Sequence, residues 1–210
     1  LNGFFPEKVA IIGAGPAGLS CAFYLAEKGY SPVIFEKNEK PGGMLRYGIP
    51  SFKLEKDVID AEIEIIKAMG VEIRCGIEVG KDVTLDQLRA EGYKAFYLAI
   101  GLQSGRKAGI PNEEYAKSGV EFLNETSFNH EKTLCGTTVV IGGGNVAIDV
   151  ARTALRAGSD HVEMYCLEGP DEMPAAADEV KEAKEEGVLI KNTVLQSNYR
   201  SNADLIYGQL

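Results

Sequence analysis

Two glycine-rich turns of the same kind stand out as the residues that could do chemistry in this sequence. Gly13-Ala14-Gly15-Pro16-Ala17-Gly18 follows the apolar run Val9–Ile12, and Gly142-Gly143-Gly144-Asn145-Val146-Ala147 follows Val139–Ile141. In each case a buried strand is expected to meet a helix N-terminus, where backbone N–H groups and the helix dipole can hold a pyrophosphate. Two such turns predict two bound dinucleotides, and the reaction that such a pair serves is hydride transfer between them.

The spacing within the first turn gives each glycine a role. Gly13 permits the tight turn, Gly15 lets the backbone approach phosphate, and Gly18 lets the helix pack closely on the strand. Glu36 ends the next expected strand, near the offset of roughly 20 residues at which an acid binds ribose hydroxyls. Because this acid accompanies the glycines, the pattern favours a dinucleotide site over a turn that merely redirects the chain.

The second turn repeats this geometry with one substitution. Gly142 and Gly144 match the first two glycines, and Ala147 takes the third place. Asn145 and Val146 come at the expected helix start, where a pyrophosphate would accept backbone hydrogen bonds.

The residues after the following strand bear on the choice between NADH and NADPH. Sites for NADPH usually present arginines there, because arginine pairs with the 2′-phosphate, but this sequence has Leu167 and Glu168. An acid accepts hydrogen bonds from a free 2′-hydroxyl and repels a 2′-phosphate, so Glu168 favours NADH. Ala147 argues weakly for NADPH, and a solvated loop acid is the alternative interpretation of Glu168.

Alternating strands and helices must position these residues. Apolar periodicity predicts strands at Lys8–Ile12, Ser31–Glu36, Val71–Arg74, Ala95–Ile100, Thr137–Ile141, His161–Leu167 and Val188–Val194, with helices at Ala17–Glu27, Lys56–Met69, Leu85–Glu91, Val146–Ala157 and Ala176–Glu186. This order predicts an α/β fold with two Rossmann-like dinucleotide-binding units and parallel sheets. We place the boundary between residues 125 and 136, with domains at 1–128 and 129–210, the second apparently incomplete.

Composition narrows the class of protein. The 210 residues are 45% hydrophobic, and 31 acidic against 22 basic side chains give a net charge of −9, which disfavours nucleic acid and anionic membrane surfaces as partners. No apolar stretch approaches the roughly 20 residues that span a bilayer. The four cysteines are scattered, which disfavours a cluster, a zinc site or a redox disulfide. We expect a cytoplasmic protein with reduced thiols.

A long segment carries a family resemblance. The run Glu36-Lys37-Asn38-Glu39-Lys40-Pro41-Gly42-Gly43-Met44-Leu45-Arg46-Tyr47-Gly48-Ile49-Pro50-Ser51-Phe52-Lys53-Leu54 resembles the FAD-domain signature of the glutamate synthase small subunit. The same signature occurs in the flavin domain of dihydropyrimidine dehydrogenase and in electron-bifurcating transhydrogenases. The resemblance extends through Leu98-Ala99-Ile100-Gly101 to Glu172-Met173-Pro174-Ala175.

The resemblance implies FAD at the first turn and NAD(P)H at the second, in an oxidoreductase that passes electrons to an iron–sulfur protein or domain. It implies the following FAD-binding residues, in chain order: Gly13, Gly15, Ala17, Gly18, Glu36, Lys37, Gly43, Met44, Lys53, Val79 and Gly101. Met44 and Lys53 would meet the flavin end or its phosphates, and Val79 the adenine. Ordinary packing for Met44, and solvated loop charges for Arg46 and Lys53, are the alternatives.

Other features leave a second function open. Members of the family return from the NAD(P) domain to a Gly-Asp turn that binds the ribityl chain, but no Gly-Asp dipeptide occurs here, and Gln196–Leu210 matches no expected element. We therefore expect these 210 residues alone to purify with little FAD, and a truncated nucleotide-binding fragment without turnover is the alternative. Flavin absorbance separates the two. A disulfide reductase is disfavoured, since no cysteine pair lies near the first turn.

Overall fold

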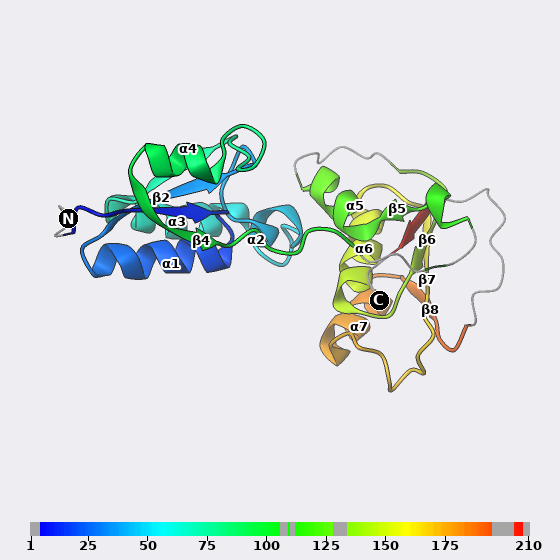
Figure 1. Ribbon diagram of the computed structural model, residues 1–210. Coiled ribbons are helices and arrows are strands. Elements are labelled where there is room, and N and C mark those ends of the chain that lie inside the picture. Colours follow the sequence, from blue (N-terminus) through cyan, green and yellow to red (C-terminus); the bar gives the residue numbers. More distant parts are fainter. Residues whose placement is uncertain (1–4, 106–108, 110–111, 128–133, 195–203, 208–210) are drawn as a thin grey trace. The chain divides into compact units, whose positions relative to one another are not determined.

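The computed structural model describes residues 5–105, 109, 112–127, 134–194 and 204–207. The chain divides into two compact units, Leu1–Leu102 and Gln103–Leu210 (Figure 1). This division lies earlier than the boundary that we placed at 128/129. The helix before that boundary accounts for the difference, because its residues Phe122 and Leu123 are buried in the core of the second unit.

The first unit is a four-stranded parallel sheet with helices in its connections. Its elements are β1 (Lys8–Ile12), α1 (Pro16–Glu27), β2 (Ser31–Glu36), α2 (Met44–Tyr47), α3 (Lys56–Ala68), β3 (Glu72–Cys75), α4 (Leu85–Ala90) and β4 (Tyr93–Leu98). The strand order is β3-β2-β1-β4. Ile12 at the end of β1 pairs with Phe35 of β2 and Leu98 of β4, so the carboxyl ends of three strands meet at one edge.

Alternation along the strands assigns the helices of the first unit to two faces. Ile11 and Ile34 point to the face covered by α1 and α3, where they form a core with helix residues such as Leu19 and Ile59. Their strand neighbours form the core under α4, with Leu88 at its centre. Successive side chains of a strand point to opposite faces, and this explains why β1 and β2 are apolar throughout.

The second unit is a five-stranded parallel sheet. Its elements are a 3₁₀ turn (Glu113–Tyr115), β5 (Lys117–Ser118), α5 (Gly119–Thr126), β6 (Thr137–Ile141), α6 (Asn145–Arg156), β7 (His161–Tyr165), α7 (Ala177–Glu185), β8 (Leu189–Lys191) and β9 (Asp204–Tyr207). The strand order is β5-β9-β6-β7-β8. Strand β9 comes from the stretch that matched no expected element, and it pairs with β6 on one side and β5 on the other.

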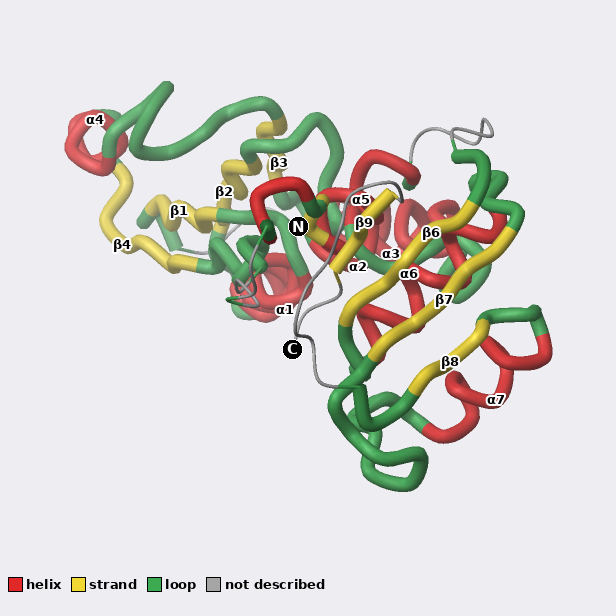
Figure 2. The backbone as a smooth tube through the Cα atoms, turned by 90° about the vertical axis from the view of Figure 1, so that its right-hand side faces the viewer, coloured by secondary structure: helices red, strands yellow, loops and turns green. Residues whose placement is uncertain are grey.

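Helices α5, α6 and α7 lie on one face of the second sheet (Figure 2). Val140, Val162 and Met164 of the strands form the core with helix residues such as Ile148 and Ala183. Both units therefore have the predicted α/β architecture with parallel strands and Rossmann-like strand-to-helix turns. In the part of the chain that the structure describes, no helix is both long and apolar enough to cross a membrane.

Candidate cofactor-binding sites

The two glycine turns have the same backbone geometry, as the sequence predicted. Gly13 follows β1 with φ 106°, and Gly142 follows β6 with φ 135°, a left-handed conformation that favours glycine. The Gly13 N–H donates to the carbonyl of Phe35, at 2.8 Å, and the Gly142 N–H donates to the carbonyl of Tyr165, at 2.9 Å. Each turn is thus tied to the end of the neighbouring strand in the same register.

Close backbone approach explains the glycines of the first turn. A Cβ on Gly13 would lie 2.3 Å from the carbonyl oxygen of Ala99, and a Cβ on Gly18 would lie 1.9 Å from the carbonyl oxygen of Gly13. Neither position has room for a methyl group, because real Cβ contacts are essentially never below about 3 Å. The first helix therefore starts directly against the end of the first strand.

Helices α1 and α6 begin in a way that suits an anion. Gly15 and Gly144 are their N-cap residues, no side chain caps either helix, and neither has an acid in its first turn. In contrast, α3, α4, α5 and α7 each have an acid in the first turn. Since an acid there would offset the positive end of the helix dipole, α1 and α6 keep that end and their first amides for a bound anion.

Glu36 is buried against the first turn, with 4% of its surface exposed. Its Oε2 accepts a hydrogen bond from the Ala14 N–H, at 2.7 Å, and its Oε1 accepts one from the Asn38 N–H, at 2.9 Å. These two bonds fix the carboxylate at the carboxyl end of β2 beside the glycine turn. Each oxygen keeps a further lone pair, which a ribose hydroxyl could use.

The segment after β2 returns to the first turn. The Gly42 N–H donates to the carbonyl of Ala14, at 2.8 Å, and a Cβ on Gly43 would lie only 2.7 Å from the Cα of Gly15. Two backbone segments therefore meet without side chains between them. This contact places Gly43 at the residue that sequence analysis assigned to phosphate.

The second turn has an equivalent contact from the segment before α7. The Ala175 N–H donates to the carbonyl of Gly143, at 3.1 Å, which is the position that Ala14 occupies in the first turn. The side chain of Asn145 also takes part, because its Oδ1 accepts a hydrogen bond from the Ala176 N–H, at 2.8 Å. Asn145 was expected at the pyrophosphate, and in the structure its side chain holds the start of α7 while its backbone opens α6.

Glu168 reaches the second turn from the loop after β7. Its Oε2 lies 2.6 Å from the place that a Cβ on Gly143 would take, and this oxygen is buried without a hydrogen-bond partner among the described residues. A buried carboxylate oxygen without a donor is costly. A ligand hydroxyl at this turn would supply the donor.

The strand position equivalent to Glu36 belongs to Cys166. Glu36 follows Phe35 and Cys166 follows Tyr165, the two residues whose carbonyls accept from the turns. Burial, and then the charge of Glu168, raise the pKa of the Cys166 thiol, so this group stays neutral. The acid of the second turn therefore comes from further along the loop than the acid of the first.

The remaining predicted residues take varied positions. Ala17, Lys37, Lys53 and Gly101 are exposed. Val79 packs beside the core under α4. In the second unit, Val146 packs beside the core and Ala147 is fully buried. Met44 folds over Gly48, where an added Cβ would lie 2.1 Å from the Met44 Cε. Arg46 is buried, so the alternative of a solvated loop charge is wrong for it. No group of acids, histidines and cysteines that could hold a metal occurs among the described residues.

Residues 7–206 match the family model described as pyridine nucleotide-disulphide oxidoreductase. The chain belongs to this family. All four cysteines of the chain are free thiols in the structure.

Curated relatives of the chain include a glutamate synthase small chain, in agreement with the resemblance seen in the sequence. The chain is 47% identical over 188 residues to the NADP(+)-dependent formate dehydrogenase subunit beta of Moorella thermoacetica, which covers 87% of this chain and 26% of that protein. It is 39% identical over 203 residues to the glutamate synthase (NADPH) small chain of Escherichia coli, and the match covers 90% of this chain and 42% of that protein. For the NAD-dependent dihydropyrimidine dehydrogenase subunit PreT of Escherichia coli, the identity is 44% over 186 residues, with 87% and 44% covered. The chain thus spans less than half the length of these relatives.

Solved structures share the fold. The Mycobacterium tuberculosis FprA in complex with NADPH superposes with a TM-score of 0.71 at 24% identity, over 86% of this chain and 48% of that one. The thioredoxin reductase of Lactococcus lactis gives a TM-score of 0.67 at 22% identity, over 95% of this chain and 68% of that one. Both support the same parallel α/β architecture for this chain.

Proposed function

We propose that this chain is the FAD- and NAD(P)H-binding part of an oxidoreductase that takes electrons from NADH and passes them through flavin to an iron–sulfur partner. The observation that carries the proposal is the pair of glycine turns with matching backbone geometry, each with a buried carboxylate oxygen beside it. Bound FAD would supply the two-electron acceptor and bound NAD(P)H the hydride, chemistry that requires positioning more than acid–base groups.

The residues at the first turn fit FAD. The first amides of α1, starting at Ala17, face the expected pyrophosphate with no acid in the first turn to oppose it. Glu36 is held by Ala14 and Asn38 in an orientation that leaves lone pairs for the adenosine ribose. The flavin-end roles of Met44 and Lys53, and the adenine contact of Val79, rest on the resemblance.

The residues at the second turn fit a nicotinamide dinucleotide with a free 2′-hydroxyl. The amides at the start of α6 are free to bind a pyrophosphate, and Glu168 Oε2 is a buried acceptor for which the described residues supply no donor. A 2′-hydroxyl would satisfy this oxygen, whereas a 2′-phosphate would bring two negative charges close together. Relatives are named for NAD and for NADP, so these residues carry the proposed preference for NADH.

The partner is proposed on two grounds. Two of the relatives above are named as subunits, and one is named as the small chain, so they act with other chains. The iron–sulfur acceptor follows from the resemblance to the glutamate synthase small subunit. Four free thiols favour a reducing compartment, which supports a cytoplasmic location.

Anaerobic titration of the full-length protein tests the electron-transfer function. One equivalent of NADH per flavin is expected to bleach the flavin absorbance. The same amount of NADPH is expected to bleach it far less. If the protein binds no flavin, the alternative of nucleotide binding without turnover is favoured.

Replacing Leu167 and Glu168 together by arginine is expected to raise the ratio of kcat/KM for NADPH to that for NADH by about tenfold to a hundredfold. A charge-assisted bond to the 2′-phosphate is worth roughly 1.5–3 kcal/mol, and 1.4 kcal/mol corresponds to a factor of ten. Steady-state rates with each cofactor measure the ratio.

Asp171→Arg is the control, because it replaces an acid by arginine in the same loop, as the substitution of Glu168 does, but at an exposed position. It is expected to change the ratio little. Equal use of both cofactors by the unmodified protein would contradict the assignment of Glu168.

A further inference from the structure

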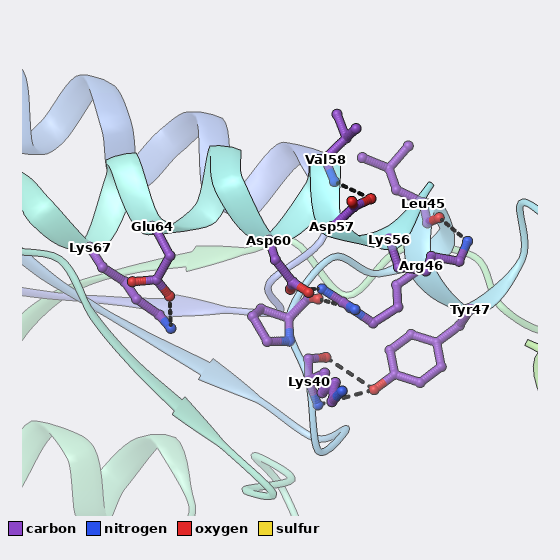
Figure 3. A network of polar contacts seen from close by, with 11 residues as sticks. Lys40, Leu45, Arg46, Tyr47, Lys56, Asp57, Val58, Asp60, Glu64 and Lys67 are labelled. Atoms are coloured by element: carbon purple, nitrogen blue, oxygen red, sulfur yellow. Dashed lines mark hydrogen bonds and ion pairs between the residues drawn. The ribbon is translucent and has the colours of Figure 1, made fainter. Parts of the chain in front are cut away.

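A buried arginine lies under the segment that returns to the first turn (Figure 3). The Arg46 side chain is only 2% exposed, and its Nε donates to the carbonyl of Pro41, at 2.6 Å. Its Nη2 forms an ion pair with Oδ1 of Asp60, a half-exposed residue of α3. A single side chain thus joins the start of the segment to the helix that follows it.

Two further side chains fasten the same segment. The Tyr47 hydroxyl donates to the carbonyl of Lys40 and accepts from its N–H, both at 3.1 Å, which closes the loop between them. Lys56, at the start of α3, donates through Nζ to the carbonyls of Leu45 and Ile49. Burial, and then the charge of Arg46, lower the pKa of Lys56.

Gly42 lies between Arg46 and the first turn. A Cβ on Gly42 would be 3.1 Å from Arg46 Cβ and 3.2 Å from Ile59 Cγ2, so the glycine backbone packs directly on the arginine and on α3. On its other side, the Gly42 N–H donates to Ala14 of the first turn. Arg46 is therefore linked through a single glycine to the turn itself.

We propose that Arg46 is a positioning residue for the first cofactor site, which fixes Gly42 and Gly43 against the glycine turn that receives the pyrophosphate. This inference rests on the proposed binding of FAD at that turn. A buried guanidinium is costly even when it is paired, and an apolar side chain of similar size would fill the space. A role in holding the segment in one place accounts for a charge at this position.

Variants at Arg46 test the inference in the full-length protein. Arg46→Met is expected to weaken FAD binding about tenfold, as measured by fluorescence titration, while NADH binding at the second turn stays unchanged. Arg46→Lys keeps the charge but not the planar fork, so it is expected to restore part of the affinity. Arg89→Met is the matched control, because it removes an arginine paired with Asp86 on α4, away from the first turn.

Hydrogen exchange of the Gly42 amide gives a second measurement that does not need flavin. Arg46→Met is expected to speed this exchange relative to that of the Ile11 amide in β1, and Arg89→Met is not. If the methionine variant fails to fold, Asp60→Asn keeps the arginine and weakens only the ion pair.

The possible results separate the two proposals. Unchanged FAD affinity together with unchanged Gly42 exchange in the Arg46 variants would overturn the positioning role. If the wild-type full-length protein binds no FAD, the proposed function fails, and the exchange of Gly42 still decides whether Arg46 holds the segment.

Discussion

Replacing Gly43 by alanine is expected to lower FAD affinity about a hundredfold and to destabilise the first unit by roughly 2–4 kcal/mol. The added methyl group would lie 2.7 Å from Gly15 Cα, and both segments are backbone that cannot move aside locally. Gly43 also has φ 53° and ψ −138°, a conformation that side-chain-bearing residues rarely adopt and that costs an alanine of order 1–3 kcal/mol. The clash would push the segment off the first turn, where the pyrophosphate is expected. Flavin titration and urea unfolding measure the two effects.

Gly76→Ala separates the clash from the backbone strain. Gly76 has φ 72°, but a Cβ there would meet no atom of the described residues within 4 Å. This variant is expected to lose only the strain term and to keep its FAD affinity. Equal losses in the two alanine variants would show that positive-φ backbone strain, rather than the contact between the two glycine segments, is what matters at Gly43.

The strand-to-helix turns could be predicted from sequence because local signals agreed there. The apolar run of β1, the three glycines and the acid at Glu36 each indicated the same unit, and the structure begins and ends β1 and β2 at the predicted residues. Such agreement between hydrophobic pattern and turn chemistry is what makes a segment predictable.

The contacts of Arg46 could not be predicted, because the burial of this side chain depends on a partner in another element. A charged residue in a glycine-rich loop is ordinarily solvated, and only the packing of α3 brings Asp60 beside it. The short helix α2 was missed for the same reason, since four residues give no periodic pattern. Glycines with proline, in contrast, correctly indicated that the chain turns there.

The second unit shows two other limits of the sequence pattern. Strand β9 has only four residues, and it is recognised by its pairing with β6, a contact across a long stretch of chain. Glu168 was expected as an acid at a strand end, but β7 ends at Tyr165 and the carboxylate reaches the turn from the loop. The sequence predicted an acid near the second glycine turn, but it did not predict the path of the loop that carries it.

An ion-pair network joins α6 to the end of α7 in this second unit. Glu186 accepts from Arg152 through Oε1, at 2.7 Å, and from Arg156 through both oxygens, at 2.6 and 2.9 Å. The Arg152 side chain is 7% exposed and also pairs with Glu182, at 2.7 Å. Hydrogen bonds from both arginines lower the pKa of Glu186 to about 2, even though its partial burial acts in the opposite direction.

The lowered pKa predicts an acid-sensitive second unit. An unfolded Glu186 would titrate near 4.5, so the network contributes fully above that pH, and its contribution is lost as the pH falls toward 2. Because Glu186 is exposed to solvent, screening reduces what this shift contributes, to roughly 1–2 kcal/mol at pH 7 and to less than about half of that at pH 3. Glu186→Gln is therefore expected to lower the free energy of unfolding by about 1–2 kcal/mol at pH 7 and by much less at pH 3. Urea unfolding followed through hydrogen exchange of the α6 amides measures the second unit by itself.

Glu185→Gln provides the comparison, because Glu185 is adjacent and 65% exposed, and its nearest lysine nitrogen, that of Lys181, is 3.9 Å away. An exposed pair of this kind contributes about 0.5 kcal/mol or less, so this variant is expected to match the wild type at both pH values. If Glu186→Gln lowers the free energy of unfolding by the same amount at pH 7 and pH 3, the carboxylate acts through its shape alone. A deficit that shrinks on acidification ties the stability of the second sheet's helical layer to the charge of one residue.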